Sequence, residues 1–198
     1  LVFSYGKKRY LLMSFFLLPL MIIVAQLLSL FFGYSFDQFS IMHEPSFTSP
    51  VLSVWLVLFL APLVEELAWH SYGTDCLRSK FTLLTTSIFF SLFWAVWHVP
   101  LGFVKGYYQS NLVDLGWLHT LNFFVSIFPF VFIMNWIYYK SGRNILLAMI
   151  FHASGNFASE VFATHPDTKI IFTLLMLVVS GVLIYRERAM FLEKKVLE

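Results

Sequence analysis

The chain has 198 residues, of which 59% are hydrophobic and only 12% are charged, and its mean hydropathy is +0.78. A water-soluble domain carries about 25% charged residues, so this chain cannot cover a folded core with a polar surface. The composition excludes an ordinary soluble protein and predicts an integral protein of the cell membrane. The formal net charge of +2 gives no indication of nucleic-acid binding.

Six apolar runs follow one another along the sequence. A helix needs ~20 apolar residues to cross the hydrocarbon core of a bilayer, and the last two runs are at the short end of that range. We therefore expect an all-α bundle of about six transmembrane helices, folded as a single membrane domain over residues 1–198. The runs cover residues 10–34, 51–72, 81–104, 117–139, 145–162 and 168–185.

The basic residues between these runs predict the orientation of the chain. With six spans, Lys105 and Lys169 fall on one side and the other eleven of the 13 basic residues fall on the opposite side. Cytoplasmic loops carry the excess of Lys and Arg, so both termini are predicted to be cytoplasmic. The long polar loops 35–50 and 105–116 are then external. A start at Leu1 rather than Met is typical of a partial chain.

Ionisable residues inside the apolar runs are the feature that needs an explanation. Glu65 and Glu66 stand side by side in "LFLAPLVEELAWHSYG", residues 58–73, and His70 follows Glu66 at i+4. Placing Asp, Lys or Arg at the middle of a membrane helix costs about 2.5–3.5 kcal/mol, so such residues indicate a functional site. The single cysteine, Cys76, excludes an internal disulfide and argues against a zinc site built from cysteines.

Two further runs bring polar side chains of a kind that suits hydrolysis. His98 ends the third run in "FWAVWHVP", and His152 and Asn156 share one helical face in "FHASGNFASE". A carboxylate can act as a general base toward water or as a metal ligand, while imidazoles and an amide can bind zinc or an oxyanion. The candidate catalytic residues are therefore Glu65, His98, His152 and Asn156, with Glu66 and His70 in support.

Each of these residues also has a structural interpretation. For Glu66 and His70 we favour a buried pair that fixes helix packing over a catalytic role. Histidines at helix ends often bond to a carbonyl group, and asparagines in membranes often bond between helices. The argument for function is the coincidence of Glu-Glu, His and His-xxx-Asn on three separate runs. The remaining polar residues are assigned to packing or interfaces: His119, Asn122, Asn135 and Glu160.

At these residues the sequence resembles the CPBP family of intramembrane proteases, which includes CAAX proteases and bacteriocin-processing enzymes and is also called Abi. The family pattern is Glu-Glu-xxx-Arg, Phe-xxx-His and His-xxx-Asn on successive helices. The chain has "EELAWH", "WAVWH" and "HASGN" in the same order. The resemblance covers about residues 50–160 and implies a protease core there.

The resemblance implies an intramembrane endopeptidase of the glutamate or metallo type. Its substrate would be a peptide or a membrane-associated protein, and lipidated proteins are among the candidates. The chain itself would lie in the lipid bilayer. Glu65 would activate water, while His98, His152 and Asn156 would bind a metal or stabilise the oxyanion. Zinc is left open as a cofactor, with Glu65, His98 and His152 as its ligands if a metal is used. No nucleic-acid partner is expected.

Two positions depart from the family pattern, because Trp94 replaces Phe and His70 replaces Arg. Arginine is always charged and histidine is not, so His70 balances Glu66 either as an imidazolium or through a neutral hydrogen bond. The alternative is therefore a catalytically degenerate membrane protein, such as a bacteriocin immunity protein or a scaffold. A proton- or ion-coupled transporter would also use intramembrane Glu and His, but the chain has no repeat with paired broken helices.

Overall fold

The computed structural model describes residues 5–42, 47–49 and 52–194, and these residues form helices joined by short connections. The all-α prediction is confirmed. The longer helices are α1 (Tyr5–Leu30), α2 (Val54–Ala68), α4 (Leu83–His98), α6 (Trp117–Lys140), α7 (Ile145–Val161) and α8 (Pro166–Arg186). The shorter ones are η1 (Phe36–Phe39), the π-helix η2 (Trp69–Gly73), α3 (Thr74–Lys80), η3 (Val99–Phe103), α5 (Tyr108–Leu115) and α9 (Arg188–Leu192).

Four helices within the described ranges are long and apolar enough to cross a membrane: Lys8–Leu30, Leu83–Phe103, Trp117–Lys140 and Pro166–Arg186. The fifth predicted span forms α7, a shorter apolar helix of 17 residues. The second is divided between α2, which has 15 residues, and η2. Six complete crossings of the membrane therefore stay a prediction, because the helices α2 and α7 of the second and fifth apolar runs have fewer than 18 residues.

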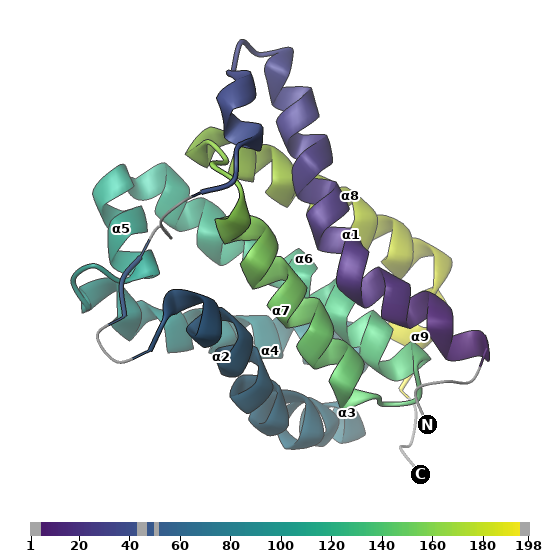
Figure 1. Cartoon of the computed structure of the whole chain (residues 1–198). Helices are drawn as coiled ribbons and strands as arrows, with labels where there is room; N and C mark the ends of the chain where they lie inside the picture. The colour runs from purple at the N-terminus through teal and green to yellow at the C-terminus, as the bar shows by residue number, and fades with distance from the viewer. Residues whose placement is uncertain (1–4, 43–46, 50–51, 195–198) are drawn as a thin grey trace.

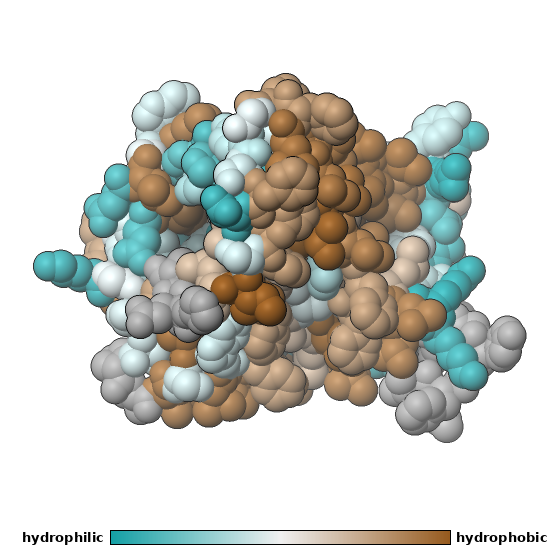
Figure 2. All heavy atoms as spheres, turned by 45° about the horizontal axis from the view of Figure 1, so that its top comes forward, coloured by the Kyte–Doolittle hydropathy of each residue, from teal (hydrophilic) through white to brown (hydrophobic). Residues whose placement is uncertain are grey.

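The surface of the molecule is largely apolar. Figure 2 shows hydrophobic residues across the middle of one face and hydrophilic residues toward its two sides. Large side chains such as Phe31 and Phe103 are 87% and 86% exposed. Exposed apolar area of this extent is unfavourable in water and is expected where helices contact lipid. The cytoplasmic location of the termini stays a prediction.

Helix α7 lies at the centre of the bundle, between α1 and α2, and also packs against α6 (Figure 1). Gly155 permits this close packing. A Cβ atom at this position would lie 2.8 Å from Leu18 Cδ1 on α1 and 2.9 Å from Phe130 Cε2 on α6. The small side chain therefore lets three helices approach at the level of the "HASGN" segment.

Each of the three helices that carry the motifs begins with a side-chain cap. The caps are Ser53 for α2, Thr82 for α4 and Asn144 for α7, and each side-chain oxygen accepts a hydrogen bond from a backbone N–H of the first turn. Such caps satisfy a donor that the helix itself cannot pair. They fix where each helix begins, and thereby the level of its motif in the bundle.

The turn between α6 and α7 is tied to α3 by Asp75. Its carboxylate accepts hydrogen bonds from Tyr139 Oη (2.8 Å), Tyr138 Oη (3.2 Å) and Arg143 Nε (2.9 Å). Arg143 has a φ of 61°, which is uncommon for a residue other than glycine. Its hydrogen bonds to Asp75 stabilise this turn and raise the pKa of Arg143.

Candidate active site

The carboxylate of Glu66 is fully buried and joins two histidines from different helices. His70 Nδ1 hydrogen-bonds to Oε2, and His152 Nδ1 donates to Oε1 at 2.7 Å. His70 Nε2 meets Asn135 Oδ1 at 2.8 Å, and the amide of Asn135 donates to Ser87 Oγ at 2.9 Å. These five residues, the Glu66 cluster, connect α2, η2, α4, α6 and α7.

The Glu66 cluster shows how a histidine can occupy the position of the family's arginine. Both ring nitrogens of His70 face oxygen acceptors, one on Glu66 and one on Asn135. An imidazole donates from both nitrogens only when it is doubly protonated. An imidazolium at His70 would donate to both oxygens, whereas a neutral ring would require the proton on Glu66 or a turned Asn135 amide. The predicted pair is present, and Asn135, which was assigned to packing, completes it from α6.

A cavity of about 500 Å³ lies beside the Glu66 cluster. Its lining includes all four candidate catalytic residues, which come from α2, α4 and α7. A volume of this size is in the range of known ligand sites. The residues concerned are Glu65, His98, His152 and Asn156.

Each of the two histidines that line the cavity is held by a hydrogen bond from its Nδ1 atom. His98 Nδ1 donates to the carbonyl oxygen of Trp94 at 2.7 Å, and His152 Nδ1 donates to Glu66. In both rings Nε2 is then the nitrogen left for a substrate or another ligand. For His98, the carbonyl bond of the structural interpretation is present, and it orients a ring that lines the cavity. A catalytic role for His98 stays a prediction.

Glu65 is ~100° around α2 from Glu66 and has different neighbours. The indole N–H groups of Trp69 and Trp94 face its carboxylate. Both nitrogens are buried, and neither completes a hydrogen bond of normal geometry within the described residues. The ring of Trp94 also packs edge-on against His152, with centroids 5.0 Å apart.

Trp94 therefore contacts three of the four candidate catalytic side chains: Glu65, His98 and His152. In the sequence, Trp94 differs from its neighbours only in replacing the Phe of the family pattern. An aromatic residue in an apolar run is typical of packing, and only the departure from the family pattern marks the position.

Zinc binding by Glu65, His98 and His152 stays a prediction. Within the described ranges, no group of three or more His, Cys, Asp or Glu side chains is arranged to hold an ion. Glu65, His98 and His152 line the same cavity, and the Nδ1 atoms of the two histidines bond to protein oxygens, which leaves Nε2 of each ring for a ligand.

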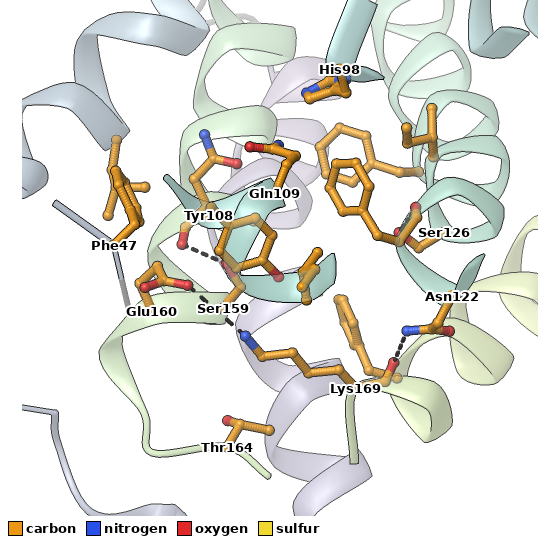
Figure 3. Close-up of a pocket in the computed structure, with 18 of the residues that line it drawn as sticks. Phe47, His98, Tyr108, Gln109, Asn122, Ser126, Ser159, Glu160, Thr164 and Lys169 are labelled. Carbon is orange, nitrogen blue, oxygen red and sulfur yellow. Dashed lines mark hydrogen bonds and ion pairs between the residues drawn. The ribbon is translucent and has the colours of Figure 1, made fainter. Parts of the chain in front are cut away.

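The far end of the cavity is polar, which sequence analysis did not predict. Glu160, expected at an interface, is 1% exposed and lines the cavity together with Lys169, Asn122 and His119. Figure 3 shows His98 at one end of the view and Glu160 and Lys169 toward the other. The cavity thus joins the candidate catalytic residues to a second group of charged side chains.

The segment 105–116, predicted as an external loop, contributes to this end. Most of it forms α5, and its residues Tyr108, Gln109 and Leu112 line the cavity. Helix α5 packs against η3 and α6. It therefore forms a wall of the cavity, which explains why so many of its polar side chains are partly or fully buried.

Comparison with known proteins gives the family. Residues 47–158 match the family described as "Type II CAAX prenyl endopeptidase Rce1-like". The chain belongs to this family. It is similar to CAAX prenyl protease 2 of Methanococcus maripaludis, with 39% identity over 180 residues that cover 91% of this chain and 66% of that protein. It is also similar to Lysostaphin resistance protein A of Staphylococcus haemolyticus, with 24% identity over 168 residues that cover 85% of this chain and 42% of that protein.

The family match confirms the resemblance to CPBP proteases that the motifs indicated. The chain spans less than two thirds of the length of either relative. The matched residues contain all three motif segments, and they end before Glu160 and Lys169. Glu160 and Lys169 at the far end of the cavity are therefore outside the residues that match the family.

Proposed function

We propose that this chain is an intramembrane endopeptidase that cleaves a prenylated protein after its modified cysteine. Prenylation occurs on the cysteine of a C-terminal C-a-a-X sequence. One observation carries the proposal: the residues of three separate motifs line a single cavity, with Glu65 facing it and Nε2 of both histidines left for substrate.

In the proposed reaction, Glu65 accepts a proton from a water molecule as the water oxygen bonds to the scissile carbonyl carbon. The negative charge that develops on the carbonyl oxygen is stabilised by a hydrogen bond from the amide of Asn156. Nε2 of a histidine adds a donor only when that ring carries a second proton, because its Nδ1 already holds the first. Glu65 then passes its proton to the leaving amine as the C–N bond breaks. A positioned general base contributes about 10²–10⁴-fold, and each oxyanion donor contributes about 10²–10³-fold.

The rival proposal is a non-enzymatic member of the family. The Glu66 cluster is complete without a substrate, so a protein that had lost catalysis could keep it for helix packing. The two proposals differ in what they require of Glu65, which makes no contribution to that cluster.

The test is cleavage of a prenylated C-a-a-X peptide by the purified full chain in lipid nanodiscs. We expect Glu65→Gln to lower kcat by about 10²–10⁴-fold, because it removes the base and keeps the shape of the side chain. Asp114→Asn, which changes an exposed carboxylate of α5, is the matched control and should leave kcat unchanged. A folded wild type that cleaves no such peptide, or a Glu65→Gln variant as active as wild type, would favour the rival.

A further inference from the structure

Lys169 brings a positive charge into the cavity from the first turns of α8. Among the described residues that line the cavity, it is the only lysine or arginine. Its Nζ lies 3.9 Å from Glu160 Oε1 and 5.3 Å from the centroid of the Tyr108 ring. Figure 3 shows the side chain extending into the cavity toward Glu160. A cation in such a place is costly, and it indicates a negatively charged ligand or a structural pair.

The geometry of the pair leaves the ammonium group able to bind a ligand. A distance of 3.9 Å is longer than a hydrogen bond, so Glu160 balances the charge without a short bond that a ligand would have to break. An ammonium group has three donors. The side-chain amide of Gln109 lies on the same part of the lining, and its Oε1 has no hydrogen-bond partner within the described residues.

Helix α7 fixes the distance between the candidate catalytic residue His152 and Glu160, the partner of Lys169. Glu160 lies two turns beyond His152, or ~12 Å at ~1.5 Å per residue, and Asn156 lies halfway. An extended peptide advances ~3.3–3.6 Å per residue, so three residues span ~10–11 Å. A peptide whose scissile carbonyl lies near His152 therefore brings its third following residue to the level of Glu160 and Lys169.

A C-a-a-X protein has three residues after its modified cysteine. The third of these carries the terminal carboxylate, which must leave water to enter the cavity and needs a cation there. We infer that Lys169 binds the C-terminal carboxylate of the substrate, so that the distance from His152 to Lys169 selects a three-residue leaving segment. This inference rests on the proposed function, and it uses residues outside the family's matched region.

The test compares two prenylated peptides that differ only in a C-terminal carboxylate or carboxamide. Hydrogen bonds to charged groups are strong enough that the wild type should prefer the carboxylate by about tenfold or more in kcat/KM. Lys169→Met should lower kcat/KM for the acid to the value for the amide, chiefly through KM. Lys169→Arg should retain the preference, and so should Lys105→Met, which changes an exposed lysine elsewhere.

The outcomes separate the two proposals. Equal cleavage of the acid and the amide by the wild type, or a preference that persists in Lys169→Met, would overturn the inference alone. The wild-type comparison decides the matter even if Lys169→Met fails to fold. Cleavage of neither peptide would overturn the proposed function, and the inference with it. Peptides with two or four residues after the cysteine should be cleaved more slowly than those with three.

Discussion

Glu65 and Glu66 are adjacent in the sequence but face two regions of opposite character. Around Glu66, the carboxylate oxygens, both histidines and Asn135 are linked by hydrogen bonds in a closed network. Around Glu65, a cavity is lined by groups that still have a donor or acceptor to offer. A satisfied polar network rigidifies helix packing, whereas unsatisfied groups in a cavity are available to bind and react. Satisfaction of hydrogen bonds, rather than burial alone, therefore distinguishes the two glutamates.

The largest effect that tests this comparison is on stability. We expect Glu66→Gln to lower the free energy of unfolding by about 3–5 kcal/mol, because it breaks the buried pairing of this carboxylate with His70 and His152. Glu65→Gln should cost less than about 1 kcal/mol, since it removes no partner of the closed network. Unfolding of the purified chain in mixed micelles with increasing SDS measures both. Equal losses in the two variants would break the distinction.

A second effect concerns the close packing of α1, α6 and α7 around Gly155, which lines the cavity. Gly155→Ala should cost about 1–3 kcal/mol, because the new Cβ would overlap Leu18 and Phe130. The matched control is Gly181→Ala on α8, where nothing lies within 4 Å of the added atom. That change should be neutral or stabilise the chain by up to about 1 kcal/mol. The same unfolding measurement serves, and a tolerated Gly155→Ala would show that α1 and α6 do not need this contact.

The smallest effect concerns the donors that face Glu65. Trp94→Phe keeps an aromatic ring and the carbonyl group that orients His98, but it removes the indole N–H. We expect kcat to fall about tenfold with little change in KM, the size of one charge-assisted hydrogen bond. Trp117→Phe, which changes a tryptophan that is 76% exposed, is the control.

Placing the sulfur isostere 3-benzothienylalanine at position 94 separates the N–H from the shape of the ring. Full activity of that variant would mean that Trp94 acts by packing only. Activity equal to that of Trp94→Phe would assign the effect to the indole N–H that faces Glu65.

Helical spacing in the sequence was enough to predict contacts between residues of the same helical segment. The all-α membrane fold and the pairing of Glu66 with His70 follow from apolar runs and from an i, i+4 interval. Contacts between helices were not predictable in this way, because spacing does not state which faces meet. The bond from His152 to Glu66 and the one from Asn135 to His70 required the structure.

Other features had no distinct signal in the sequence. Lys169 was counted only as a basic residue of a loop region, and Trp94 looked like one more aromatic residue of an apolar run. The number of complete spans stays a prediction, because the second apolar run contains a short helix followed by a π-helix. The candidate site residues Glu65 and Glu66 could be predicted because a charge inside an apolar run is costly. Lys169 and Trp94 could not, because a lysine near a helix end and an aromatic residue in an apolar run are both common.

The π-helix η2 has a consequence for comparing this chain with its relatives. The N–H of Thr74 bonds to the carbonyl oxygen of Trp69, five residues back instead of four. The extra residue rotates everything after it by ~100° about the helix axis. Asp75 comes directly after this point and reaches Arg143 in the rotated position. A relative with a regular α-helix here lacks the extra residue of the π-helix. To keep both Glu66 and Asp75 in their positions, it must have one residue fewer between them. An alignment of this stretch should therefore contain a gap.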